Sequence, residues 1–212
     1  MIGKVFRIFR EKGGLLKALD LWEWYENLPY KYQKKVKHYY SLKTIKSINF
    51  PFKAKHFDTG EIDNPLYTKR TFLGTLAQTA LLEGDLEFAE WLYNEALKME
   101  GTPYEAHLIL NDLILLAQKQ KDMEKVKKYV FQDVELYKDY KDELKERWGG
   151  TIPQIIAFEI YVYLLEREGK IDEALKLVEW IKKEGITYPY YDQVKERLQS
   201  KLENQGEDIS SI

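Results

Sequence analysis

Apolar residues recur at spacings of three and four along most of this chain, from about residue 65 to residue 203. Two sets show the spacing most clearly: Leu73, Leu76, Ala77, Ala80 and Leu81, then Phe88, Ala89, Leu92, Tyr93 and Ala96. Such spacing places the members of each set on one face of an α-helix. The pattern therefore predicts a series of amphipathic helices over this part of the chain.

Glycine, threonine and proline mark the expected ends of these helices. Gly84 suits the position just past a helix, and Asp85 suits the N-cap of the next one. Gly101 ends a second helix, and the segment 102–105 supplies a capping threonine, a proline at the first helical position and a glutamate that completes a capping box. The segment 151–154 has the same form. These signals predict helices in pairs joined by tight turns.

The composition excludes several classes of protein. The 212 residues include no cysteine and three histidines, which excludes disulfides, thiolate metal sites and a His-rich metal site. No stretch approaches the roughly 20 apolar residues that span a bilayer, and Lys4, Arg7 and Arg10 interrupt the apolar N-terminus where a secretory signal would be continuous. We expect a soluble, cytoplasmic protein. Its many lysines and glutamates are compatible with a thermophilic source.

Internal similarity suggests repeats. Residues 82–89 are echoed by residues 165–174: each has a helix end, a glycine, a short polar turn, and an alanine five residues after the glycine. A third copy at 121–126 lacks the glycine. The chain resembles the tetratricopeptide (TPR) family of 34-residue helix–turn–helix units. Residues 70–103 match its pattern best, at Leu76, Ala77, Ala89, Tyr93 and Ala96.

The resemblance implies an all-α fold, an α-solenoid of stacked helix-turn-helix repeats with a helical N-terminal extension and a C-terminal capping helix. It implies a non-enzymatic scaffold that binds another protein or a second copy of itself, without a cofactor. The positions that would face the partner-binding groove are Gln78, Asn111, Asp112, Leu115, Glu159, Tyr163 and Arg167. Gly74 and Leu115 occupy places where carboxylate-binding family members carry polar residues, so we expect no capture of an acidic C-terminus.

Three segments follow from these patterns. Residues 1–64 form a basic, aromatic-rich helical extension with a loop, residues 65–203 form the repeat domain, and residues 204–212 form a short frayed tail. Within the repeats, residues 123–148 predict one helix of about 25 residues, roughly 38 Å long. Its overhang is either a docking surface or a support for the N-terminal extension.

The charge is divided unevenly along the chain. Residues 1–56 hold 13 Lys and Arg against 4 Asp and Glu (+9), and residues 57–212 hold 20 against 31 (−11), which sum to the net −2. The basic extension either docks on acidic residues of its own chain or of a second copy, or it binds a nucleic acid or another polyanion. The candidate polyanion site is Lys31, Lys34, Lys35, Lys37, Lys43 and Lys46, interleaved with tyrosines. Ion pairs from Lys31, Lys35 and Lys43 to the acidic part would favour docking.

Two further features carry weaker hypotheses. Residues 2–10 place apolar side chains between basic ones, which suits packing on the repeats or an anionic membrane surface. His56, Asp58, Glu61 and Asp63 cluster in the loop and could hold a metal in an enzyme if the fold gathered them. No glycine-rich nucleotide loop, nucleophile elbow or paired-histidine motif occurs. We therefore expect no catalytic residues and no metal site.

Overall fold

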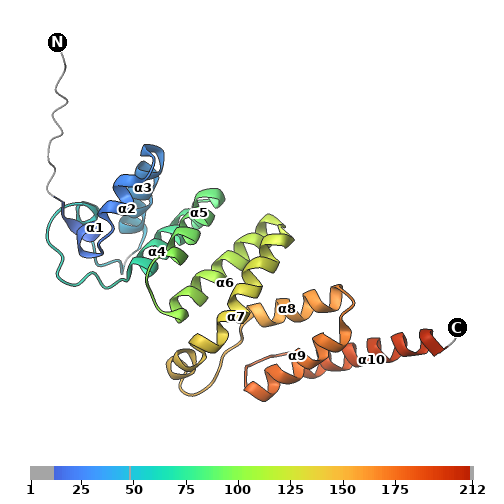
Figure 1. Ribbon diagram of the computed structural model, residues 1–212. Helices are drawn as coiled ribbons and strands as arrows, with labels where there is room; N and C mark the ends of the chain where they lie inside the picture. Colours follow the sequence, from blue (N-terminus) through green and yellow to red (C-terminus); the bar gives the residue numbers. More distant parts are fainter. Residues whose placement is uncertain (1–11, 48, 211–212) are drawn as a thin grey trace, which may run out of the picture. The chain divides into compact units, whose positions relative to one another are not determined.

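A computed structural model describes residues 12–47 and 49–210, and in them it shows ten α-helices, one 3₁₀ turn and no strand (Figure 1). Their bounds are α1 Gly14–Ala18, α2 Trp22–Asn27, α3 Tyr30–Lys46, η1 Ala54–Phe57, α4 Lys69–Leu82, α5 Leu86–Lys98, α6 Pro103–Gln120, α7 Met123–Arg147, α8 Ile156–Arg167, α9 Ile171–Glu184 and α10 Tyr191–Ser210. The all-helical class is confirmed for this part of the chain. No helix in it is long and apolar enough to cross a bilayer.

The chain divides into two compact units, Met1–Gly101 and Thr102–Ile212. The predicted boundary at residue 64, between the N-terminal extension and the repeats, stays a prediction. Within the first unit α3 packs against α4, and Tyr39 of α3 stacks on Phe88 of α5 with ring centroids 5.4 Å apart. The basic extension and the first helix pair therefore share one core.

The hairpin of α4 and α5 follows the sequence pattern closely. Leu76 and Ala77 of α4 and Ala89 of α5 are fully buried. Gly84 has φ +83° in the turn, a conformation that favours glycine. The Asp85 carboxylate accepts a hydrogen bond from the Phe88 N–H at 3.4 Å, as an N-cap does. The predicted stop and start signals are confirmed here.

The spacing of Leu15, Leu19 and Trp22 predicts a helix from about residue 15 to residue 27, but the structure breaks it into α1 and α2. Asp20 adopts φ +50° between them, which no α-helix accommodates. The segment after α3, for which sequence shows no period, is an ordered cover for the core: Phe57 is fully buried, its ring lies 5.1 Å from that of Tyr40, and the Tyr40 hydroxyl donates to the Lys53 carbonyl at 2.9 Å. Contacts between aromatic rings, and not a regular helix, hold this segment on the core.

The second unit begins with the hairpin of α6 and α7. The predicted capping box is present: the Glu105 N–H donates to the Thr102 hydroxyl and the Thr102 N–H donates to the Glu105 carboxylate, each at 3.2 Å. The turn between these helices lacks glycine, yet Lys121 adopts the left-handed conformation with φ +59°. The third copy of the turn therefore forms without its glycine, at a cost of about 1 kcal/mol.

The long helix α7 matches the predicted length, and its overhang has a clear role within its own unit. The Tyr137 ring lies 5.2 Å from that of Phe158 in α8 and 5.7 Å from that of Trp180 in α9. Lys141 pairs with Glu184 of α9 at 2.9 Å. The overhang supports the hairpin of α8 and α9, a role that the sequence analysis did not consider.

The last helix, α10, packs beside α9, as Figure 1 shows. Leu198 is fully buried, and Arg197 and Lys201 both pair with Glu166 of α8 at 2.8 and 2.9 Å. Burial opposes ionisation of Glu166, but these two cations hold its pKa below the usual value. The helix continues to Ser210, whereas a frayed tail was expected from residue 204. The amphipathic hypothesis for residues 2–10 lies outside the described residues.

Candidate functional site

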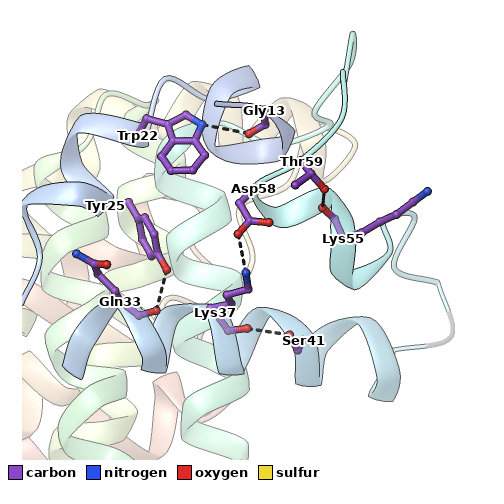
Figure 2. A network of polar contacts seen from close by, with 9 residues as sticks. All are labelled: Gly13, Trp22, Tyr25, Gln33, Lys37, Ser41, Lys55, Asp58 and Thr59. Carbon is purple, nitrogen blue, oxygen red and sulfur yellow. Dashed lines mark hydrogen bonds and ion pairs between the residues drawn. The ribbon is translucent and has the colours of Figure 1, made fainter. Parts of the chain in front are cut away.

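Three of the six lysines in the candidate polyanion site are engaged in ion pairs within the first unit. Lys35 pairs with Asp85 at 2.6 Å, Lys46 with Glu83 at 2.5 Å, and Lys37 with Asp58 at 2.6 Å. Figure 2 shows the Lys37 ammonium beneath the Asp58 carboxylate, which is buried. For these three lysines the structure supports docking of the basic helix on acidic residues of its own chain.

Asp85 is the centre of this docking. Its carboxylate caps α5 and also accepts hydrogen bonds from the Lys35 ammonium and the Tyr39 hydroxyl, the latter at 2.8 Å. Burial opposes ionisation of Asp85, but the Lys35 and Tyr39 hydrogen bonds hold its pKa below the ordinary value. Burial, with the Asp85 charge, raises the pKa of Tyr39 to about 12. One carboxylate thus ties α3 to the turn between α4 and α5.

The remaining three lysines, Lys31, Lys34 and Lys43, make no ion pair within residues 12–47 and 49–210. The Lys34 ammonium lies 4.5 Å from the ring centre of Tyr30, which is itself 70% exposed. Ion pairs from Lys31, Lys35 and Lys43 were the predicted sign of docking. Lys35 pairs with an acidic residue, whereas Lys31 and Lys43 pair with none in the described residues, so the prediction is met in part.

The acidic and histidine cluster of the loop is not brought together. The His56 Nδ1 accepts a hydrogen bond from the Lys53 N–H at 3.2 Å, and Asp58 faces Lys37 (Figure 2). Glu61 and Asp63 line a separate cavity of about 320 Å³. Among the described residues, no group of three or more potential ligands could hold a metal ion. The metal-enzyme hypothesis therefore has no assembled site.

The residues of the predicted groove fall in both units. Gln78 is exposed on α4 of the first unit. In the second unit, Asn111, Asp112 and Leu115 lie on α6, and Glu159, Tyr163 and Arg167 lie on α8 at spacings of four. The two helices contact each other. The six second-unit residues thus lie on two neighbouring helices, and we call their exposed side the α6/α8 face.

Apolar side chains are exposed on this face. Leu115 is 49% exposed and Tyr163 is 53% exposed. Leu108 lies on α6 two turns before Leu115 and is 44% exposed. Single exposed leucines are ordinary on protein surfaces. Three large exposed apolar side chains on two adjacent helices, two of them at predicted groove positions, are a better candidate for a contact surface.

Two side-chain oxygen atoms of the predicted groove residues lack a hydrogen-bond donor. The Asn111 Oδ1 and one carboxylate oxygen of Glu159 are buried, and neither has a partner in the described chain. Burial raises the pKa of Glu159, and a hydrogen bond with Gln154 partly opposes the rise. Buried acceptors are normally satisfied, so these two oxygens mark places where a donor is missing.

A buried polar cluster lies behind Asn111, and we call it the His107 cluster: His107, Asn111, Asp133 and Tyr140. The His107 Nδ1 lies 2.8 Å from the Asp133 carboxylate, and the Asn111 Nδ2 lies 3.1 Å from the His107 Nε2. The Tyr140 ring stacks on the imidazole at 4.2 Å, and its hydroxyl is 3.5 Å from Asp133. Burial raises the pKa values of Asp133 and Tyr140 above their ordinary ranges.

Asp133 and Tyr140 are not among the site residues predicted from the sequence. The sequence does contain a sign of the buried aspartate. Asp133 lies three residues after Val130 and four before Tyr137, so it shares the apolar face of α7 with these two residues, which are both buried. An acidic residue on the buried stripe of a helix requires a partner. Here the partner is the histidine of the preceding helix, which the sequence shows among apolar residues.

Comparison with known proteins gives one informative match. No protein-family model matches the chain, and no solved structure does. A protein of Aquifex aeolicus (strain VF5), described as "Uncharacterized protein", is 88% identical over 202 residues, which cover 95% of this chain and 100% of that protein. Its source is a thermophile, which agrees with the composition rich in lysine and glutamate. At this identity over nearly the full length of both proteins, the chain belongs to the same family as the Aquifex aeolicus protein.

Proposed function

We propose that this protein is a non-catalytic, TPR-like interaction module that binds another protein through the α6/α8 face. The observation that carries the proposal is the combination found there: exposed Leu115 and Tyr163 beside buried oxygens of Asn111 and Glu159 that lack donors. Exposed apolar area and unsatisfied acceptors are both costs to the free protein. A partner that covers the first and supplies donors to the second removes both.

The energies involved are large enough to matter. Truncation of a central tyrosine or leucine contact commonly costs about 1–3 kcal/mol of binding. A buried acceptor without a donor costs about 1–3 kcal/mol. The two oxygens have almost no accessible surface in the free protein, so the Asn111 and Glu159 side chains must rotate for a partner to reach them.

The arrangement of the helices supports the TPR-like part of the proposal. Helices pair as α4 with α5, α6 with α7 and α8 with α9. The small residues Ala77, Ala89 and Ala96 are fully buried in the first pair, where the TPR pattern has small residues so that paired helices can approach closely. Gly84 and Gly169, with φ +83° and +75°, occupy equivalent turns.

Polyanion binding is the second and weaker candidate. Lys31, Lys34 and Lys43 make no ion pair within the described chain, but Lys43 lies about 14 Å farther along α3 than Lys34. Three separated charges make a small footprint compared with the 6–10 phosphate contacts of a typical DNA-binding protein. Binding of single-stranded DNA or RNA at low salt, with affinity that falls steeply as salt rises, would support this candidate instead.

Site-specific photo-crosslinking tests the proposal. A benzophenone amino acid at Leu115 or at Tyr163 is expected to crosslink the same partner in extracts of the native host, with nuclease treatment as a control. The matched control is Lys138, which is exposed on α7 and has no hydrogen bond or ion pair in the described chain. A label there is expected to give no crosslink to that partner.

The affinity for the purified partner then decides between contact and proximity. Leu115→Ala and Tyr163→Ala are each expected to weaken binding roughly 5- to 30-fold, and Lys138→Ala is expected to leave it unchanged. Crosslinks of equal yield at all three positions, or full affinity in both truncation variants, would refute the α6/α8 face as the binding site.

A further inference from the structure

The His107 cluster can hold one proton more or one proton fewer, and its two states have different charges. Asp133 is fully buried and the His107 residue is 4% exposed. A carboxylate beside a neutral imidazole leaves one net negative charge inside the protein. An added proton makes the pair neutral overall, which lowers the cost of burial. The raised pKa of Asp133, caused by burial, agrees with a cluster that readily takes up a proton.

Asn111 must respond to this proton. In the neutral state the His107 Nδ1–H donates to Asp133, so the Nε2 carries a lone pair and the Asn111 Nδ2 donates to it at 3.1 Å. The Asn111 Oδ1 then points away from the imidazole and is left without a donor. When the Nε2 is protonated it must donate instead, and the carboxamide satisfies it by turning over, with Oδ1 toward the ring.

The contacts of the imidazole are limited, so the proton balance can be stated completely for the described residues. From α7 they are Asp133 and Tyr140. From α6 they are Asn111 and Tyr104, whose ring centre is 6.2 Å from that of His107. Arg147 lies beyond, over the Tyr104 ring at 4.6 Å. From α8, which also packs against α6, the nearby ionisable groove residue is Glu159, and it bonds Gln154.

We propose that Asn111 determines which partner group the α6/α8 face accepts, and that the proton on the His107–Asp133 pair sets its polarity. With His107 neutral, Asn111 offers a carbonyl oxygen and selects a group that donates N–H. With the pair protonated, it offers an NH₂ group and selects an acceptor. The consequence for partner choice rests on the proposed function of this face, whereas the proton-linked turn of the carboxamide does not.

The turn of the carboxamide is tested without any ligand. Long-range ¹⁵N–¹H spectra of the full-length protein, recorded from about pH 8 to about pH 4, report the protonation of both His107 nitrogens and the Asn111 NH₂ signals. We expect an unprotonated Nε2 at the upper pH and Asn111 shifts that follow protonation of the ring. An Nε2–H tautomer at the upper pH, or Asn111 signals that do not follow the ring, would overturn the inference.

The choice of partner group is tested with two small amides of similar shape. N-methylacetamide has one N–H donor and N,N-dimethylacetamide has none. With His107 neutral, we expect the first to bind the face near Asn111 and Leu115 roughly fivefold more tightly than the second, the effect of one hydrogen bond. The preference is expected to disappear in Asn111→Ala, and to disappear in the unmodified protein once His107 is protonated.

The pH comparison keeps the test decisive when the variant does not fold. Equal affinity for the two amides, or binding of neither, would overturn the assignment of Asn111. The proposed function would not fall with it, because that depends on crosslinking at Leu115 and Tyr163.

Discussion

Replacement of Asp85 should reveal how firmly the basic helix α3 is held to the rest of the first unit. The Asp85 carboxylate caps α5 and bonds both Lys35 and Tyr39 of α3. Loss of an N-cap side chain costs about 1 kcal/mol. The two hydrogen bonds are partly exposed and together contribute about 1–2 kcal/mol. We therefore expect Asp85→Ala to lower the free energy of unfolding of the first unit by about 2–3 kcal/mol.

Two other variants separate the contributions. Asp85→Asn keeps a good N-cap and loses the charge, so about 1 kcal/mol should be lost. Lys35→Ala should cost a similar amount, and Lys31→Ala, at an exposed lysine without an ion pair in the described residues, should cost close to zero. Because the folded-state pKa of Asp85 is lowered, the charge contributes fully above the unfolded pKa of about 4 and is lost as pH falls through the folded pKa.

Hydrogen exchange of the intact chain is the suitable assay, because it resolves the two units separately. Amides of α3 and α5 should exchange faster in Asp85→Ala, and amides of α8 and α9 should be unaffected. The difference between the unmodified protein and Asp85→Asn should shrink below about pH 4. Equal effects of Lys31→Ala and Lys35→Ala, or no difference between Asp85→Asn and Asp85→Ala, would refute the reasoning.

Two further predictions concern the loop and the acid stability. Gly14→Ala should destabilise the first unit by at least about 2 kcal/mol, because φ is +66° and a Cβ would lie 2.6 Å from the His56 carbonyl oxygen. Gly60→Ala should cost only about 1 kcal/mol, because Gly60 has φ +83° but open space around it. Thermal unfolding of the two variants would show the difference. Hydrogen bonds from Lys127 and Lys170 lower the pKa of Glu168 to about 2. The unmodified protein should therefore lose stability relative to Glu168→Gln as pH falls from about 4 toward 2, which acid titration by circular dichroism would show.

Local signals in the sequence predicted much of the secondary structure. The Gly84–Asp85 turn, the capping box at Thr102 and Glu105, and the length of α7 depend on neighbouring residues, so they can be read from the chain directly. The break between α1 and α2 could not, because a left-handed aspartate at position 20 has no strong local signal. The order of the loop at Phe57 also depends on rings that are distant in sequence.

The candidate site shows the same limit. The sequence pattern predicted Asn111, Leu115 and Tyr163 for a groove, and the structure places them on two helices that contact each other. The pattern could not show that Asn111 contacts a buried histidine, which in turn bonds a buried aspartate. Likewise, the charge count showed a basic extension without showing which lysines it uses for docking.

Helical periodicity and turn chemistry act over a few residues, so the sequence by itself determined an all-helical chain and most helix ends. Ion pairs such as Lys35 with Asp85, and hydrogen bonds such as His107 with Asp133, join side chains 50 and 26 residues apart. Only the packing of helices brings such groups within about 3 Å of each other. The tertiary structure therefore decided the division into units, the docking of α3 and the polar cluster behind the α6/α8 face.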